Sequence, residues 1–108
     1  MTSEKFKMAL RNRDINFILI GTPTNHRHIR TIMDTKYGTI IFQEATIANL
    51  TRAYITLKTH PKIKAMRLTL KEMDKEEIKL GYARFQLIES EIDSKKLQEE
   101  IDKQCSDR

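Results

Sequence analysis

The longest uninterrupted apolar run in this chain covers only residues 17–20, Phe-Ile-Leu-Ile. A run of four residues is far too short to cross a bilayer, and the opening Met-Thr-Ser-Glu-Lys lacks the apolar segment of a secretion signal. The run ends in Gly21 and predicts a buried strand over residues 14–21. The single cysteine, Cys105, excludes an intramolecular disulfide. We therefore expect a cytoplasmic protein.

The rest of the sequence alternates between helix-like and strand-like segments. Apolar residues at helical spacing predict helices over residues 4–12, from a cap at Thr24 or Asn25 to about Lys36, and over residues 45–59. β-branched or alternating runs predict strands over residues 39–43 and 63–70. Strands that alternate with helices are typical of a parallel sheet with crossover helices. We therefore predict one α/β domain over residues 1–108, with a small, mainly parallel sheet of three to four strands in the order α-β-α-β-α-β-α.

Residues 72–103 fit two patterns. Most are good helix formers, and Ile78, Phe85 and Ile92 are seven residues apart, which predicts one long helix or two helices broken near Asp93. The alternative is a strand over residues 78–88 that forms a hairpin with residues 63–70, and it would make the fold α+β with a C-terminal hairpin. We favour the helix because residues 72–77, which would connect the two strands of that hairpin, contain no Gly, Asn or Pro. The charged segment 89–108 is then helical.

Charge divides the chain into two regions. Residues 1–71 carry a net charge of +9 and residues 72–108 a net charge of −4, within a total of +5. A basic region can bind an anionic partner, or an acidic segment can fold back over it. The basic cluster near the third predicted strand is the best candidate for nucleic-acid binding, and it consists of Lys58, Lys62, Lys64 and Arg67.

The end of the first predicted strand is a candidate anion site. Ligands of α/β proteins gather where strands end and helices begin, because free N–H groups and the helix dipole meet there. The turn has one glycine and lacks the Gly-Lys-Ser/Thr of a phosphate loop. Its expected contacts are Gly21, Thr22, Thr24, Arg27 and Arg30.

No catalytic or metal-binding pattern is visible in the sequence. The histidines His26 and His28 are two residues apart and would not share a helix face, whereas His60 and Cys105 stand elsewhere in the chain. We expect no metal, no cofactor and no enzymatic activity. The expected function is that of a small binding or regulatory protein that acts through a protein partner or self-association. Leu97 and Ile101 of the C-terminal segment are the candidate contact residues. The alternatives are a nucleic-acid-binding accessory protein and recognition of a small anion at the Gly21 turn.

Overall fold

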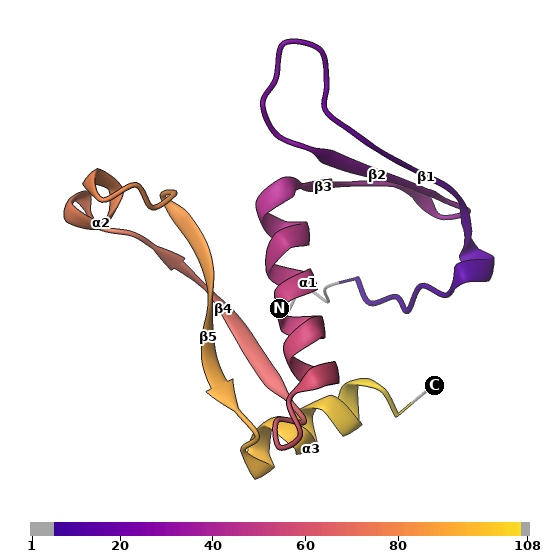
Figure 1. Ribbon diagram of the computed structural model, residues 1–108. Coiled ribbons are helices and arrows are strands. Elements are labelled where there is room, and N and C mark those ends of the chain that lie inside the picture. The colour runs from indigo at the N-terminus through magenta and orange to yellow at the C-terminus, as the bar shows by residue number, and fades with distance from the viewer. Residues whose placement is uncertain (1–5, 107–108) are drawn as a thin grey trace, which may run out of the picture. The chain divides into compact units, whose positions relative to one another are not determined.

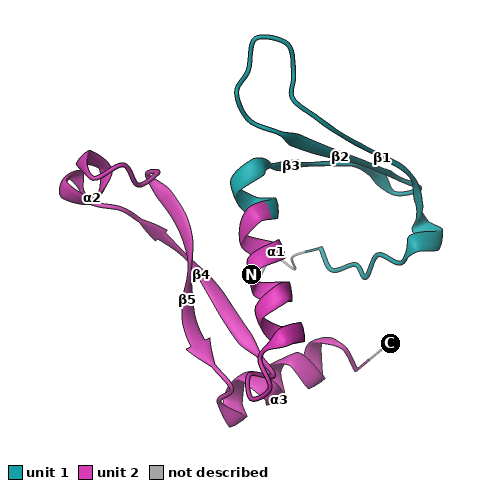
Figure 2. Ribbon diagram, viewed as in Figure 1, with its two compact units in different colours: residues 1–47 teal, residues 48–108 magenta. Residues whose placement is uncertain are grey.

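The computed structural model describes residues 6–106 of the chain (Figure 1). The chain divides into two compact units, residues 1–47 and residues 48–108, and the boundary falls inside the longest helix (Figure 2). The expectation that the chain is one domain stays a prediction.

The first unit is built around a three-stranded antiparallel sheet. Its elements in chain order are the 3-10 turn η1 (Asn12–Asp14), the strands β1 (Ile15–Gly21), β2 (Arg30–Thr35) and β3 (Gly38–Gln43), and the start of helix α1 (Glu44–Thr59). The sheet order is β1-β2-β3, so β2 is the central strand. The register places Ile32 of β2 between Leu19 of β1 and Ile41 of β3.

The second unit contains most of α1 and an antiparallel hairpin. Its further elements are β4 (Met66–Glu72), α2 (Lys75–Lys79), β5 (Phe85–Ile92) and α3 (Lys95–Gln104). The hairpin pairs β4 with β5, from Met66 opposite Ile92 to Glu72 opposite Phe85. All three buried apolar residues among those described lie in this unit: Ala65, Met73 and Leu97.

The prediction of a mainly parallel α/β sheet is wrong. Every strand pair in the described residues is antiparallel, and the strands form two separate sheets, so the fold is α+β. Two parts of the chain differ from the prediction: α1 does not bring β3 and β4 into one sheet, and the crossover helix between the first two strands is absent. The predicted helix from Thr24 or Asn25 to Lys36 is a loop over residues 22–29 followed by β2. With that crossover helix gone, β1 and β2 are joined as a hairpin and run antiparallel.

The spacing of Ile29, Ile32 and Met33 suggested a helix, but it covers too few residues to exclude a strand. Thr31, Ile32 and Thr35 are β-branched and favour extended backbone. Pairing on both sides of β2 outweighs the weak helical preference of six residues. Gly38, at φ 142°, follows the β2–β3 turn and begins β3.

The prediction of a long helix over residues 72–103 is also wrong. The structure has the hairpin of the alternative interpretation, with its second strand at 85–92 in place of 78–88. The chain reverses through α2. At the start of this helix the backbone N–H of Glu77 donates to the carboxylate of Asp74 at 2.8 Å, and the backbone N–H of Asp74 donates to the carboxylate of Glu77 at 3.1 Å. Gly81 follows with φ 101°. A short helix and one glycine therefore make the turn, and the capping pair Asp74 and Glu77 is the sequence signal that was missed.

Other expectations hold or need only small shifts. The strands predicted over residues 14–21 and 39–43 are β1 and β3, and the helix predicted over 45–59 is α1. The strand predicted over 63–70 is β4, displaced by two to three residues. A break near Asp93 is present, because Ser94 caps α3. The predicted helix over 4–12 is absent from its described part, where residues 6–11 are irregular.

Candidate interaction site

The N-terminal sheet has two faces, and both carry apolar side chains. Residues directly opposite one another in an antiparallel ladder point to the same face, and the faces alternate along each strand. The Ile32 face, as we call it, is formed by Phe17, Leu19, Ile32 and Ile41, with Arg30 and Asp34 at its ends. The Met33 face, on the other side, is formed by Ile18, Ile20, Thr31, Met33, Thr35, Ile40 and Phe42.

The Ile32 face is the more open of the two. Phe17, Leu19 and Ile41 are 51%, 54% and 61% exposed. No residue of this face is buried, and the only buried residues of the described part of this unit are Asp14, Thr31 and Thr35, all of them polar. Large apolar side chains on adjacent strands thus form a continuous exposed patch. Such patches typically mark binding surfaces.

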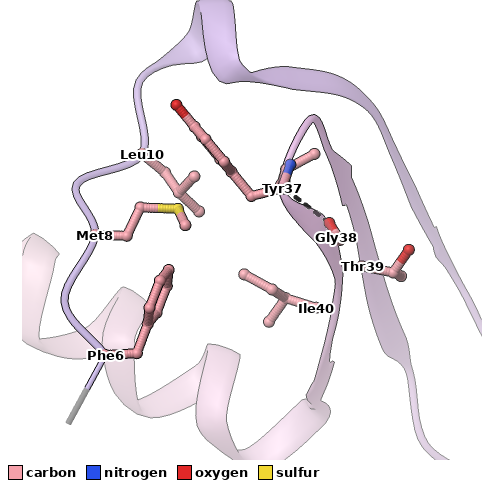
Figure 3. A pocket seen from close by; sticks show the side chains of 8 residues that line it. Phe6, Met8, Leu10, Tyr37, Gly38, Thr39 and Ile40 are labelled. Atoms are coloured by element: carbon pink, nitrogen blue, oxygen red, sulfur yellow. Dashed lines mark hydrogen bonds between the residues drawn. The ribbon is translucent and has the colours of Figure 1, made fainter. Parts of the chain in front are cut away.

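The Met33 face is partly lined by the chain itself. Thr31 and Thr35, which point to this face, are 7% and 6% exposed. Figure 3 shows Phe6, Met8 and Leu10 of the N-terminal segment turned toward the strand side chains, around a groove of about 380 Å³. The segment before β1 therefore contributes to this side of the sheet.

Two opposite charges stand at the ends of the Ile32 face. Arg30 is the first residue of β2 and Asp34 the fifth, with Ile32 midway between them. The guanidinium of Arg30 donates through Nη1 to the carbonyl oxygens of His28 and Ile29, at 3.2 and 3.4 Å. The carboxylate of Asp34 accepts from Asn16 Nδ2 at 3.0 Å and from Thr39 Oγ1 at 3.3 Å. These contacts are solvent-exposed, so each charged group is able to form a further ion pair.

Both edges of this sheet lack the usual protection against further pairing. Natural edge strands often carry lysine, proline or inward-pointing charge, which discourage the addition of another strand. The outer strands β1 (Ile-Asn-Phe-Ile-Leu-Ile-Gly) and β3 (Gly-Thr-Ile-Ile-Phe-Gln) contain neither a charged residue nor a proline. The sheet is therefore apolar on its faces and unguarded along its edges.

The residues of the predicted anion site lie at one end of the β1–β2 hairpin. Gly21 ends β1 opposite Arg30 of β2, whereas Thr22, Thr24 and Arg27 lie in the exposed loop between them. No helix begins at this turn, so the structure lacks the helix N-terminus on which the hypothesis was founded.

A carboxylate already occupies the end of this loop. Glu44 Oε1 accepts the backbone N–H of Ile29 at 3.0 Å, and Oε2 lies 3.2 Å from His28 Nδ1. The Ile29 hydrogen bond, and then that of His28, lower the pKa of Glu44 below its ordinary value. Glu44 therefore fastens the loop to the start of α1, and it places negative charge beside the expected anion contacts.

The residues of the predicted nucleic-acid cluster differ in whether a carboxylate pairs with them. Arg67 forms ion pairs with Glu100 at 2.5 Å and Glu91 at 3.2 Å, and these carboxylates raise its pKa. Ser94 and then Arg67 lower the pKa of Glu91. Arg67 thus ties β4 to β5 and α3. Within residues 6–106, no carboxylate pairs with Lys58, Lys62 or Lys64, which lie at the end of α1 and in the following loop.

The C-terminal contact residues suggested by the sequence are placed differently from one another. Leu97 is only 3% exposed and belongs to the core of the second unit, whereas Ile101 is 36% exposed. Leu97 is therefore unavailable to a partner in the folded unit, and the exposed apolar Ile32 face of the first unit is the better candidate surface.

The described residues were compared with the geometry of a metal site and of a membrane-spanning helix. Among them, no three His, Cys, Asp or Glu side chains come together as a metal site. No helix between residues 6 and 106 is both long enough and apolar enough to cross a bilayer.

Comparison of the chain with family models, curated proteins and solved structures finds no match. Sequence reasoning missed the Ile32 face because residues 17–20 were interpreted as a buried strand and residues 30–35 as a helix. The β-branched residues Thr31, Ile32 and Thr35 of β2 are the signal that could have located it.

Proposed function

We propose that this protein is a small, non-enzymatic binding or regulatory protein that acts through a protein partner or self-association, and that the Ile32 face makes that contact. The observation that carries the proposal is the exposure of Phe17, Leu19 and Ile41 on one face of a sheet whose unit buries no apolar side chain among its described residues. Burying such side chains contributes about 25 cal/mol per Å² of apolar surface. A cytoplasmic location is part of the same proposal.

The edges and faces of the sheet support this proposal jointly. A three-stranded sheet is stable when its apolar side chains pack against a further layer. The N-terminal segment lines part of the Met33 face, and the Ile32 face remains for another layer. This face is aliphatic at its centre, with Phe17 and the charged residues in its end rows, and an apolar centre with a polar rim is typical of a protein interface.

The test is the reactivity of a cysteine placed on the face in dilute protein. In an Ile41→Cys variant, maleimide should label the thiol at position 41 at about the rate of the exposed Cys105, which serves as an internal reference. A Thr35→Cys variant is the matched control, because Thr35 is buried on the other face, and it should label slowly. If the thiol at position 41 labels more than about tenfold slower than Cys105 even in dilute protein, the chain covers its own face and the proposal fails.

A second candidate function, nucleic-acid binding, is favoured by the unpaired lysines Lys58, Lys62 and Lys64. Three cations within seven residues, without carboxylate partners among the described residues, suit contacts to phosphates. Replacing all three by Gln should weaken binding to labelled DNA or RNA and lower the salt dependence by about three phosphate contacts. Arg67→Gln is the control, because Arg67 is already paired, and it should change binding little. Equal loss in both variants, or no binding by the parent at near-physiological salt, would exclude this function.

A further inference from the structure

We propose that the occupant of the Ile32 face is a second copy of this chain, packed face to face with its strands antiparallel to those of the first. This inference rests on the proposed function, because it names the partner of the same surface. It follows from the order of groups along β2, where Arg30, Ile32 and Asp34 place a cation, an apolar centre and an anion on one face.

The charges select one of two symmetric arrangements. Two identical sheets can stack about a two-fold axis that lies between them, either along the strands or across them. An axis along the strands sets Arg30 over Arg30 and Asp34 over Asp34 of the second copy, which is repulsive. An axis across the strands at Ile32 sets Arg30 over Asp34 of the second copy, twice. The face is therefore complementary to itself only in the antiparallel arrangement.

The dimensions suit such pairs. Arg30 and Asp34 are four residues apart, about 13 Å along the strand, and stacked sheets lie about 10 Å apart. An arginine side chain extended from one sheet meets a carboxylate of the facing sheet at that spacing. Each guanidinium has five N–H donors, and the described contacts of Arg30 use Nη1 alone. The carboxylate of Asp34 accepts one bond on each oxygen and has capacity for more.

The centre of the interface is apolar. In the antiparallel arrangement Ile32 lies on the axis and meets its own counterpart, while Leu19 and Ile41 flank it on the neighbouring strands. The patch covers three strands, about 14 Å by about 20 Å, or roughly 280 Å² on each copy, which is below the roughly 800 Å² per partner of a standard specific interface. We therefore expect a dimer that dissociates on dilution.

Charge exchange tests the geometry. Sedimentation of the full chain from about 5 µM to about 500 µM should show a monomer–dimer equilibrium, and Arg30→Asp or Asp34→Arg alone should raise the dissociation constant at least tenfold. The double variant Arg30→Asp/Asp34→Arg should dimerise as the parent does. An equimolar mixture of the two single variants should also form dimers, because each Asp at position 30 then faces an Arg at position 34. Circular dichroism confirms that each variant is folded.

Cross-linking is a second measurement that does not depend on the charge variants. In a Cys105→Ser background, an Ile32→Cys thiol lies on the two-fold axis and should give a covalent dimer with a short bis-maleimide. The matched variant Met33→Cys places its thiol on the opposite face and should not.

Each other outcome overturns the inference in a recognisable way. A parent chain that stays monomeric at the highest concentration while the Ile41→Cys thiol labels rapidly leaves the face to a different protein: the proposed function then stands and the second copy is excluded. Dimers that ignore the charge changes indicate pairing along the edges of β1 or β3, because Arg30 and Asp34 lie on the central strand. Single variants that dimerise poorly and are not rescued by mixing also contradict the antiparallel arrangement.

Discussion

Lys36 is joined to Asp14 by two hydrogen bonds, one from its side chain and one from its backbone. Lys36 Nζ donates to Asp14 Oδ1 at 2.9 Å, and the backbone N–H of Lys36 donates to the Asp14 carbonyl oxygen at 3.0 Å. The backbone N–H of Arg11 donates to the other carboxylate oxygen at 2.9 Å. Asp14 is 2% exposed, so this carboxylate ties the segment before β1 to the turn between β2 and β3 from inside the unit.

Asp14→Asn should therefore destabilise the first unit. The amide keeps the size of the side chain but loses the charge that Lys36 pairs with, and its NH₂ group faces donors where an acceptor is needed. We expect the Tm to fall by roughly 5 °C or more, measured by thermal unfolding at neutral pH. Asp102→Asn is the control, since that carboxylate accepts only an exposed bond from Gln98. An unchanged Tm for Asp14→Asn would show that the buried carboxylate contributes nothing.

Acid should destabilise the fold because it protonates three carboxylates that are hydrogen-bonded in the folded chain. Hydrogen bonds and neighbouring cations hold the pKa of Asp14 below its ordinary 3.8 and the pKa values of Glu44 and Glu91 below 4.5. A lowered folded-state pKa contributes stability that is complete above the unfolded value and is lost as pH falls through the folded value. Stability against urea should thus be level from pH 7 to about pH 5 and decline below about pH 4.5. Stability that rises on acidification from pH 5 to pH 3 would contradict this assignment.

Leu97→Ala should destabilise the second unit without affecting association. Leu97 is 3% exposed on α3, and truncation of a buried leucine costs about 2 to 4 kcal/mol. Ile101→Ala, at a position that is 36% exposed, should cost less than about 1.5 kcal/mol. Urea unfolding gives both values, and sedimentation of the folded variants should match the parent. A folded Leu97→Ala variant that loses association would indicate that α3, and not the Ile32 face, is the contact surface.

Gly81→Ala should cost stability through its backbone alone. Gly81 has φ 101°, where a side chain is strained, yet a Cβ built there meets no atom within 4 Å. We expect a loss of about 1 to 2 kcal/mol. Gly21→Ala is the matched control, since its Cβ is equally unobstructed and its φ is ordinary, and it should be neutral or slightly stabilising. Equal effects of the two substitutions would show that the backbone at Gly81 is not a constraint.

Local patterns were sufficient where a segment has one dominant signal. The apolar run that ends in Gly21, the β-branched residues 39–43 and the wide apolar face before Pro61 predicted β1, β3 and α1 close to their observed bounds. They failed where two periodicities fit the same few residues. In residues 29–35 the helical spacing of the apolar residues competes with the strand preference of the β-branched residues, and only the hydrogen bonds to β1 and β3 decide between them.

The candidate site followed the same division. The sequence showed that Phe17 and Leu19 are apolar and that the chain has no catalytic pattern, and it led us to expect these side chains inside a sheet covered by helices. Which face Arg30 and Asp34 share, and that this face is open, depends on the antiparallel register.

By itself the sequence determined three elements and the positions of several breaks, because capping residues, β-branched runs and prolines act within a few residues. Tertiary structure alone decided the strand order, the burial of Asp14 and Leu97 and the exposure of the Ile32 face, because strand pairing and burial join residues that are far apart in the chain.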